Sequence, residues 1–210
     1  MNIDPVAVAV SFGVLLLSLT IHEAAHAWTA DKLGDPTARA LGRVSLNPLV
    51  HIDWIGTVLL PLMAMLTGLR FLIGWAKPVP VMIRNLRHPR RDFMIVAAAG
   101  PISNLLQACV ASIFLRLVWN PALGPEQGVL AEVLYLMVLT NLVLAFFNLI
   151  PVPPLDGGNV LLGLLPPRLA AHYSGLRQYG FIILYALMFT GIASALIMPP
   201  TKFLMGILIP

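Results

Sequence analysis

Long apolar runs constrain the fold of this 210-residue chain more than any other feature of its sequence. Hydrophobic residues make up 59% of the chain and charged residues only 10%, whereas soluble domains carry roughly 25% charged residues. The sequence therefore predicts an all-α polytopic membrane protein with four to six transmembrane helices, in a single domain over residues 1–210. The runs long enough to cross a bilayer core of roughly 30 Å as helices are 6–30, 93–119, 129–150 and a C-terminal helix at 179–198.

A fifth apolar run, residues 54–69, is shorter and contains Pro61. The loops on both sides of it, 31–53 and 70–92, carry Lys and Arg, whereas the segment before the first run and the loop at 120–128 carry none. Cytoplasmic loops of membrane proteins are enriched in Lys and Arg, so both basic loops are expected in the cytoplasm and the N-terminus outside. The run between these loops is therefore predicted to be re-entrant or interfacial, and a tilted full span is the alternative.

The net charge of +4 does not indicate a nucleic-acid partner. The basic residues lie in loops between apolar runs, where they would face anionic lipid headgroups, and no basic and aromatic stripe accompanies them. The expected partner is the lipid bilayer. The single cysteine, Cys109, excludes an intrachain disulfide, and the acidic segment before residue 6 does not look like a signal peptide, so the first run is expected to be retained.

The first apolar run contains His22-Glu23-Ala24-Ala25-His26, an HExxH pattern. Residues at positions i and i+4 share one face of a helix, so the two imidazoles can bind one Zn²⁺ ion. The glutamate between them can take a proton from a water molecule that the metal activates. Polar side chains inside a membrane span are costly and mark functional sites, although polar residues at the interface are the simpler alternative.

A catalytic zinc site needs a third protein ligand, and Asp156 is the candidate. It follows the run at 129–150, after prolines that end the helix and just before Gly157, which permits close approach of the backbone. An aspartate in an ordinary loop is the alternative. Asp156 can meet His22 and His26 only if the chain crosses the membrane an even number of times between them, which independently predicts that 54–69 does not cross.

Three patterns in the chain together resemble the site-2 protease family, peptidase M50. They are the HExxH pattern, the Gly-Pro-Ile-Ser-Asn segment at 100–104, and the N-x-x-P-x-P-x-x-D-G pattern at 148–157. The resemblance covers about residues 6–160, the expected core. The segments at 46–48 and 74–81 are most similar to the short bacterial branch that lacks PDZ and CBS domains.

The resemblance implies that His22, His26 and Asp156 bind one catalytic zinc ion within the helix bundle and that Glu23 is the catalytic acid and base. It implies that Asn104 and Asn148 help to position the substrate backbone or the oxyanion, although asparagines in spans also simply bond neighbouring helices. The expected activity is hydrolysis of peptide bonds in or near transmembrane segments of membrane proteins, as in regulated intramembrane proteolysis.

The resemblance to the bacterial branch also implies a location in the bacterial inner membrane. The basic loop at 31–53 follows the histidine pair, so the active site is expected towards the cytoplasm. A segment such as 77–84 would offer a strand edge to the unwound substrate, in a short β-hairpin between the first two core helices. The loop residue His51 is expected to be an interfacial or capping histidine rather than a ligand. Two alternatives are a non-proteolytic metal-binding membrane protein, which would not need Glu23, and a transporter, for which no inverted repeat is visible. The oligomeric state is left open.

Overall fold

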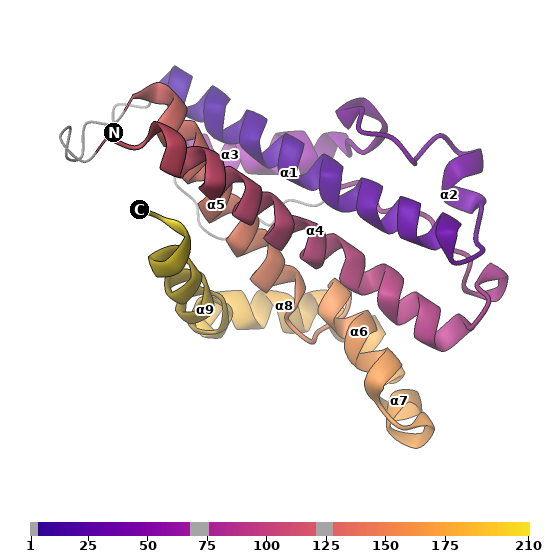
Figure 1. Ribbon diagram of the computed structural model, residues 1–210. Coiled ribbons are helices and arrows are strands. Elements are labelled where there is room, and N and C mark those ends of the chain that lie inside the picture. The colour runs from indigo at the N-terminus through magenta and orange to yellow at the C-terminus, as the bar shows by residue number, and fades with distance from the viewer. Residues whose placement is uncertain (1–3, 68–75, 121–127) are drawn as a thin grey trace.

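The computed structural model describes residues 4–67, 76–120 and 128–210 of the chain, and Figure 1 shows them as a bundle of helices. Within these ranges the regular secondary structure is entirely helical. The protein is therefore all-α in its described part, as predicted.

Three long helices form the centre of the bundle: α1 (Pro5–Lys32), α4 (Pro89–Val118) and α5 (Val129–Asn148). All three are long and apolar enough to cross a membrane, and they correspond to the first three long runs predicted from the sequence. Figure 1 shows that α4 runs back along α1 and that α5 runs back along α4. The end of α1, the start of α4 and the end of α5 therefore lie at the same end of the bundle.

Helix α4 is the central helix, because it packs against α1, α5 and α6 (Asp156–Leu164). Its buried face is built from small residues, including Ala97, Gly100, Ala108 and Ala111. Small residues let helix backbones approach closely, which drives packing where lipid removes the hydrophobic driving force between helices. This close approach brings the polar groups of neighbouring helices within hydrogen-bonding distance of one another.

The run predicted at 54–69 forms a π-helical turn, Trp54–Leu59, followed by α3 (Leu60–Thr67). The side chain of Asp53 caps its start by accepting hydrogen bonds from the backbone N–H groups of Ile55 and Gly56. The 6 and 8 helical residues span about 21 Å at 1.5 Å per residue, which is less than a bilayer core. The end of the run, at 68–69, lies outside the described residues, so its re-entrant or interfacial character stays a prediction, with a tilted full span as the alternative.

The β-hairpin predicted between the first two core helices is not confirmed. Residues 76–82 have no regular secondary structure, and a short 3₁₀ turn, Ile83–Asn85, follows them. The remaining residues of that region, 68–75, lie outside the described part of the chain.

The C-terminal helix predicted at 179–198 is wrong in its bounds. The structure has two helices there, α8 (Gly180–Phe189) and α9 (Ile192–Leu208), and the segments on the two sides of the break meet at 70°. Gly191 ends α8 because its backbone is left-handed, with φ of 78°. Pro199 and Pro200, just beyond the predicted end, lie inside α9. Prolines are tolerated within membrane helices when neighbouring groups satisfy the freed carbonyls. The described residues thus contain three membrane-length helices, or four if the bent pair is one span; only four reaches the lower limit of the predicted four to six.

Candidate metal centre

The two histidines of the HExxH pattern lie one turn apart on α1 and face α4. Both are buried, and their Nε2 atoms are 3.0 Å apart. The rings meet edge to face, with centroids 4.7 Å apart. Two nitrogen atoms therefore point to one place on the inner face of the helix, as the helical spacing predicts.

Asp156 reaches the same place from the far end of α5. The chain leaves α5 at Asn148, turns through the proline-rich segment and enters α6 with Asp156 as its first residue. The turn is tight, because a Cβ atom on Gly157 would lie 2.3 Å from the Leu149 carbonyl oxygen. The Asp156 Oδ2 atom consequently lies 3.1 Å from His22 Nε2 and 3.3 Å from His26 Nε2.

These three atoms fit the geometry of a zinc site. A tetrahedral Zn²⁺ ion with bonds of about 2.0–2.1 Å holds its ligand atoms about 3.3 Å apart, close to the separations of 3.0, 3.1 and 3.3 Å seen here. Asp156 Oδ2 is also buried with no hydrogen-bond donor among the described residues, as expected of an oxygen that faces a cation. Two imidazoles and one carboxylate form a donor set suited to zinc, with room for a fourth ligand.

Each histidine is oriented by a hydrogen bond from its other ring nitrogen. His22 Nδ1 donates to Asn104 Oδ1 at 2.6 Å, and His26 Nδ1 donates to the Val96 carbonyl at 2.7 Å, both on α4. These bonds leave both Nε2 lone pairs free to face a metal, as outer-sphere partners of zinc ligands commonly do. Asn104 is fully buried, so it lies behind the ligand and away from the cavity surface.

The sequence analysis missed the rest of this network. Asn104 Nδ2 donates to Asn141 Oδ1 at 2.7 Å, and Asn141 Nδ2 donates to Ser18 Oγ at 3.0 Å. The network therefore joins α4, α5 and α1 behind the metal site. The sequence does contain a signal for this network: each of three apolar runs carries an uncharged polar residue, Ser18, Asn104 or Asn141. Polar side chains are rare in membrane spans and usually bond to a neighbouring helix or mark a functional site.

Gly100 supplies the space that the two imidazoles occupy. A Cβ atom at this position would lie 2.3 Å from His26 Nε2 and 2.5 Å from His22 Nε2. Any side chain on α4 at this point would push the rings out of the site, so the glycine of the Gly-Pro-Ile-Ser-Asn segment has a steric role.

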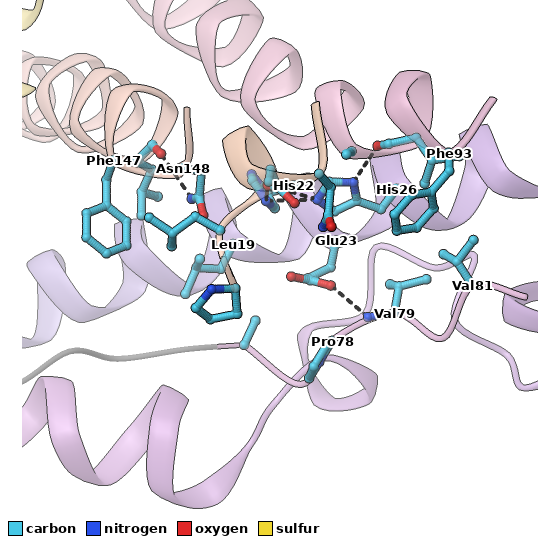
Figure 2. A pocket seen from close by; sticks show the side chains of 18 of the residues that line it. Leu19, His22, Glu23, His26, Pro78, Val79, Val81, Phe93, Phe147 and Asn148 are labelled. Atoms are coloured by element: carbon cyan, nitrogen blue, oxygen red, sulfur yellow. Dashed lines mark hydrogen bonds and ion pairs between the residues drawn. The ribbon is translucent and has the colours of Figure 1, made fainter. Parts of the chain in front are cut away.

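Glu23 points from the same helix towards the segment at residues 76–82, which we call the strap. Its Oε2 atom accepts a hydrogen bond of 3.1 Å from the Val79 backbone N–H (Figure 2). Between the strap and the metal site lies a cavity of about 550 Å³, lined by residues of α1, α4, α5, α6, α8 and the strap. The buried Glu23 carboxylate and the three candidate ligand atoms therefore line the same cavity.

Asn148 lines this cavity, unlike Asn104. Its side chain lies at the end of α5 and donates to the Leu144 carbonyl at 3.0 Å, one turn earlier in the same helix (Figure 2). His51, by contrast, lies outside the metal site: its Nε2 atom is 2.8 Å from the Ser45 carbonyl, and burial lowers its pKa. The structure therefore brings together His22, Glu23, His26 and Asp156, with Asn148 at the cavity wall.

A candidate metal centre of this kind inside a bundle of membrane-length helices is typical of a membrane metalloprotease, and the comparisons with known proteins agree. Residues 124–190 match Peptidase family M50. The chain is 39% identical over 190 residues to a Bacillus subtilis protein named "Putative zinc metalloprotease YwhC", covering 88% of this chain and 82% of that protein.

Mycobacterial relatives with the same description, named Rip2, are also similar. The identity is 33% over 175 residues for Mycolicibacterium smegmatis (83% of this chain, 64% of the relative) and 30% over 190 residues for Mycobacterium tuberculosis H37Rv (89% and 70%). The chain belongs to peptidase family M50, the site-2 protease family. No solved structure matches it.

Proposed function

We propose that this protein is an intramembrane zinc endopeptidase that hydrolyses peptide bonds in or near transmembrane segments of membrane proteins. His22, His26 and Asp156 would hold one catalytic zinc ion. The observation that carries the proposal is the convergence of these three ligand atoms on a buried point beside the Glu23 carboxylate. A metal site with a purely structural role would not need an acid beside an open cavity.

When bound, the zinc ion would polarise the scissile carbonyl and acidify the attacking water molecule. Glu23 would accept the proton that this water loses and then deliver it to the nitrogen of the leaving amine. His22 and His26 keep their geometry during these steps because Asn104 and Val96 hold their Nδ1 atoms. Asn148, at the cavity wall, is placed to bind the substrate backbone.

The free backbone groups of the strap support the proposal that the substrate binds as an extended peptide. Among the described residues, the Val81 N–H and the carbonyl groups of Val79 and Val81 have no hydrogen-bond partner. Extended peptides bind to such free backbone edges by adding a strand, and Pro78 and Pro80 cannot donate to a second neighbour. A transmembrane helix that unwinds locally could pair with this edge while its peptide bond enters the cavity.

The basic residues support an orientation with the metal site towards the cytoplasm. Arg39 and Arg43 follow α1, Arg87 precedes α4, and Arg90 lies in the first turn of α4, all at the end of the bundle that contains the site. By the positive-inside rule, the N-terminus would then lie outside. We infer that the membrane is the inner membrane of a bacterium, because the similar proteins are bacterial.

The substitution Glu23→Gln tests the proposal, because it keeps the size of the side chain and removes its basicity. We expect zinc content to stay at one ion per chain and cleavage to fall by about 100- to 10,000-fold. Proteomics of membrane protein fragments in cells that express the wild type or Glu23→Gln would identify substrates, and purified zinc-loaded protein would then be assayed on one of them.

A matched control, Asp156→Asn, should lose zinc as well as activity. Fragments that are identical in the two strains, together with unchanged cleavage by purified Glu23→Gln, would contradict a proteolytic role. Zinc flux into vesicles by both proteins would instead indicate a transporter.

A further inference from the structure

The strap is held by a buried arginine that lies outside the metal site. Arg43 is 5% exposed, and its Nη2 atom donates to the backbone carbonyls of Lys77 and, at 3.3 Å, Pro78. The loop after α1 fixes Arg43 in turn, because its own N–H donates to the Ala38 carbonyl at 2.8 Å, beyond the left-handed turn at Gly42.

The contact with Pro78 has a direct consequence for Glu23. The Pro78 carbonyl and the Val79 N–H belong to one peptide group, which is planar and rigid. Arg43 binds the oxygen of this group, and Glu23 binds its N–H at 3.1 Å. The cation and the anion therefore lie at the negative and positive ends of a single peptide dipole, and they also attract each other across it.

The other end of the strap is held by a buried residue of opposite charge from the same loop. Asp35 is fully buried, and its carboxylate accepts hydrogen bonds from the Met82 N–H at 2.6 Å and from Asn85 Nδ2 at 2.8 Å. Burial would raise the pKa of Asp35, but the bonds from Thr37, Asn85 and Met82 hold it below its usual value. The carboxylate therefore stays charged. Arg43 thus binds one end of the strap and Asp35 binds the other, and the free backbone groups of Val79 and Val81 lie between these two contacts.

A residue that only held the strap by hydrogen bonds would not need a positive charge at position 43. No carboxylate lies within ion-pair distance of Arg43 among the described residues, and its Nε atom is buried without a hydrogen-bond partner there. Burying a cation without a direct partner is costly, and a neutral donor could bind the same carbonyls. The positive charge acts on the Pro78–Val79 peptide group and, through it, on Glu23.

We propose that Arg43 is a positioning residue: it holds the Pro78–Val79 peptide group in the orientation that presents its N–H to Glu23 and the free strap edge to the substrate. This inference rests on the proposed peptidase function. It makes Arg43 part of the machinery that aligns substrate and acid, although Arg43 lies outside the sequence patterns that mark the family.

The test compares Arg43→Ala with Arg39→Ala in purified, zinc-loaded protein. Arg39 lies in the same loop and has a 61% exposed side chain that pairs with Asp31, so its removal takes the same charge from the loop without touching the strap. We expect Arg43→Ala to keep its zinc and to lose kcat by about 10- to 100-fold, and Arg39→Ala to retain wild-type kcat. Millimolar methylguanidinium, which can enter the vacated space, should restore part of the kcat of Arg43→Ala.

A second measurement does not depend on cleavage. Hydrogen exchange of peptides that cover residues 76–82 should show a loss of protection at the Val79 amide in Arg43→Ala and none in Arg39→Ala. If Arg43→Ala folds poorly, Arg43→Lys and Arg43→Gln replace it. The lysine variant should keep more kcat per bound zinc than the glutamine variant, because lysine retains the charge.

Three results would overturn the positioning role: wild-type kcat in zinc-loaded Arg43→Ala, equal kcat in the lysine and glutamine variants, or unchanged Val79 protection. A purely structural role would lower the amount of zinc-loaded protein and leave kcat per zinc unchanged. Failure of the proposed peptidase function would look different, since neither wild type nor any Arg43 variant would then cleave peptide, while the exchange result would still report on the strap.

Discussion

At the scale of single residues, Asn104 and Asn148 show how one expected role separates into two environments. Asn104 is fully buried and its oxygen accepts a hydrogen bond from the zinc-facing His22. Asn148 lines the cavity and bonds only to the preceding turn of its own helix among the described residues. The first residue is placed to orient a ligand, and the second is placed to meet a substrate.

We therefore predict opposite defects for Asn104→Ala and Asn148→Ala. Asn104→Ala should weaken zinc binding by about 10- to 100-fold, because loss of the outer-sphere bond frees the ring of His22. Asn148→Ala should bind zinc like the wild type and lose activity through kcat or KM. Competition with a chelator measures the affinity. Wild-type zinc binding by Asn104→Ala would contradict the orienting role.

At the scale of helices, the break between α8 and α9 depends on one backbone conformation. Gly191 adopts φ of 78°, and nothing lies within 4 Å of the position that its Cβ atom would occupy. A substitution there is therefore limited by backbone strain and not by space. The bend brings α9 against α5, where Leu204, Met205 and Leu208 pack on the core formed by Ala108, Ala111, Val138 and Leu142.

Gly191→Ala should destabilise the protein by about 1–2 kcal/mol, the cost of a left-handed conformation for a residue with a Cβ atom. Gly206→Ala is the matched control, because Gly206 lies inside α9 with equally open surroundings and ordinary helical geometry. That variant should be neutral or more stable by about 0.5–1 kcal/mol. Denaturant unfolding in detergent micelles, followed by helical circular dichroism, measures both, and equal effects would exclude strain as the cause of the break.

At the scale of the whole molecule, the metal site needs the end of α1 and the start of α6 at the same end of the bundle. Helices α4 and α5 supply one passage out and one passage back. The region at 54–69, described as far as Thr67, is predicted not to add a third passage. The even number of membrane crossings predicted from the basic loops is the number that a shared zinc site requires.

An even number of membrane crossings between α1 and α6 predicts that Arg39 and Arg87 lie on the same side of the membrane and that Asn120 lies on the other. Single cysteines at these positions, introduced after Cys109→Ser, would be labelled with a membrane-impermeant maleimide. In intact cells only Asn120→Cys should react, and in inside-out vesicles only the other two. Opposite labelling of Arg39→Cys and Arg87→Cys would show that the 54–69 region crosses the bilayer.

Much of the site is visible in local sequence. His22, Glu23 and His26 lie where the helical repeat places them, and hydropathy alone located α1, α4 and α5. Asp156 could be proposed because prolines and glycines mark the turn before it. These predictions succeed because the period of a helix, its membrane length and its breaking residues are properties of neighbouring positions.

Other features depend on contacts between distant positions, which no local pattern encodes. Asn104 meets His22 from 82 residues away, and Arg43 meets the Pro78 carbonyl from 35 residues away. The helix predicted at 179–198 instead breaks at Gly191, which ends α8 because of its backbone conformation, and α9 continues past residue 198. Which polar group satisfies which partner is decided by helix packing, since a buried donor or acceptor bonds whatever group the fold brings within reach.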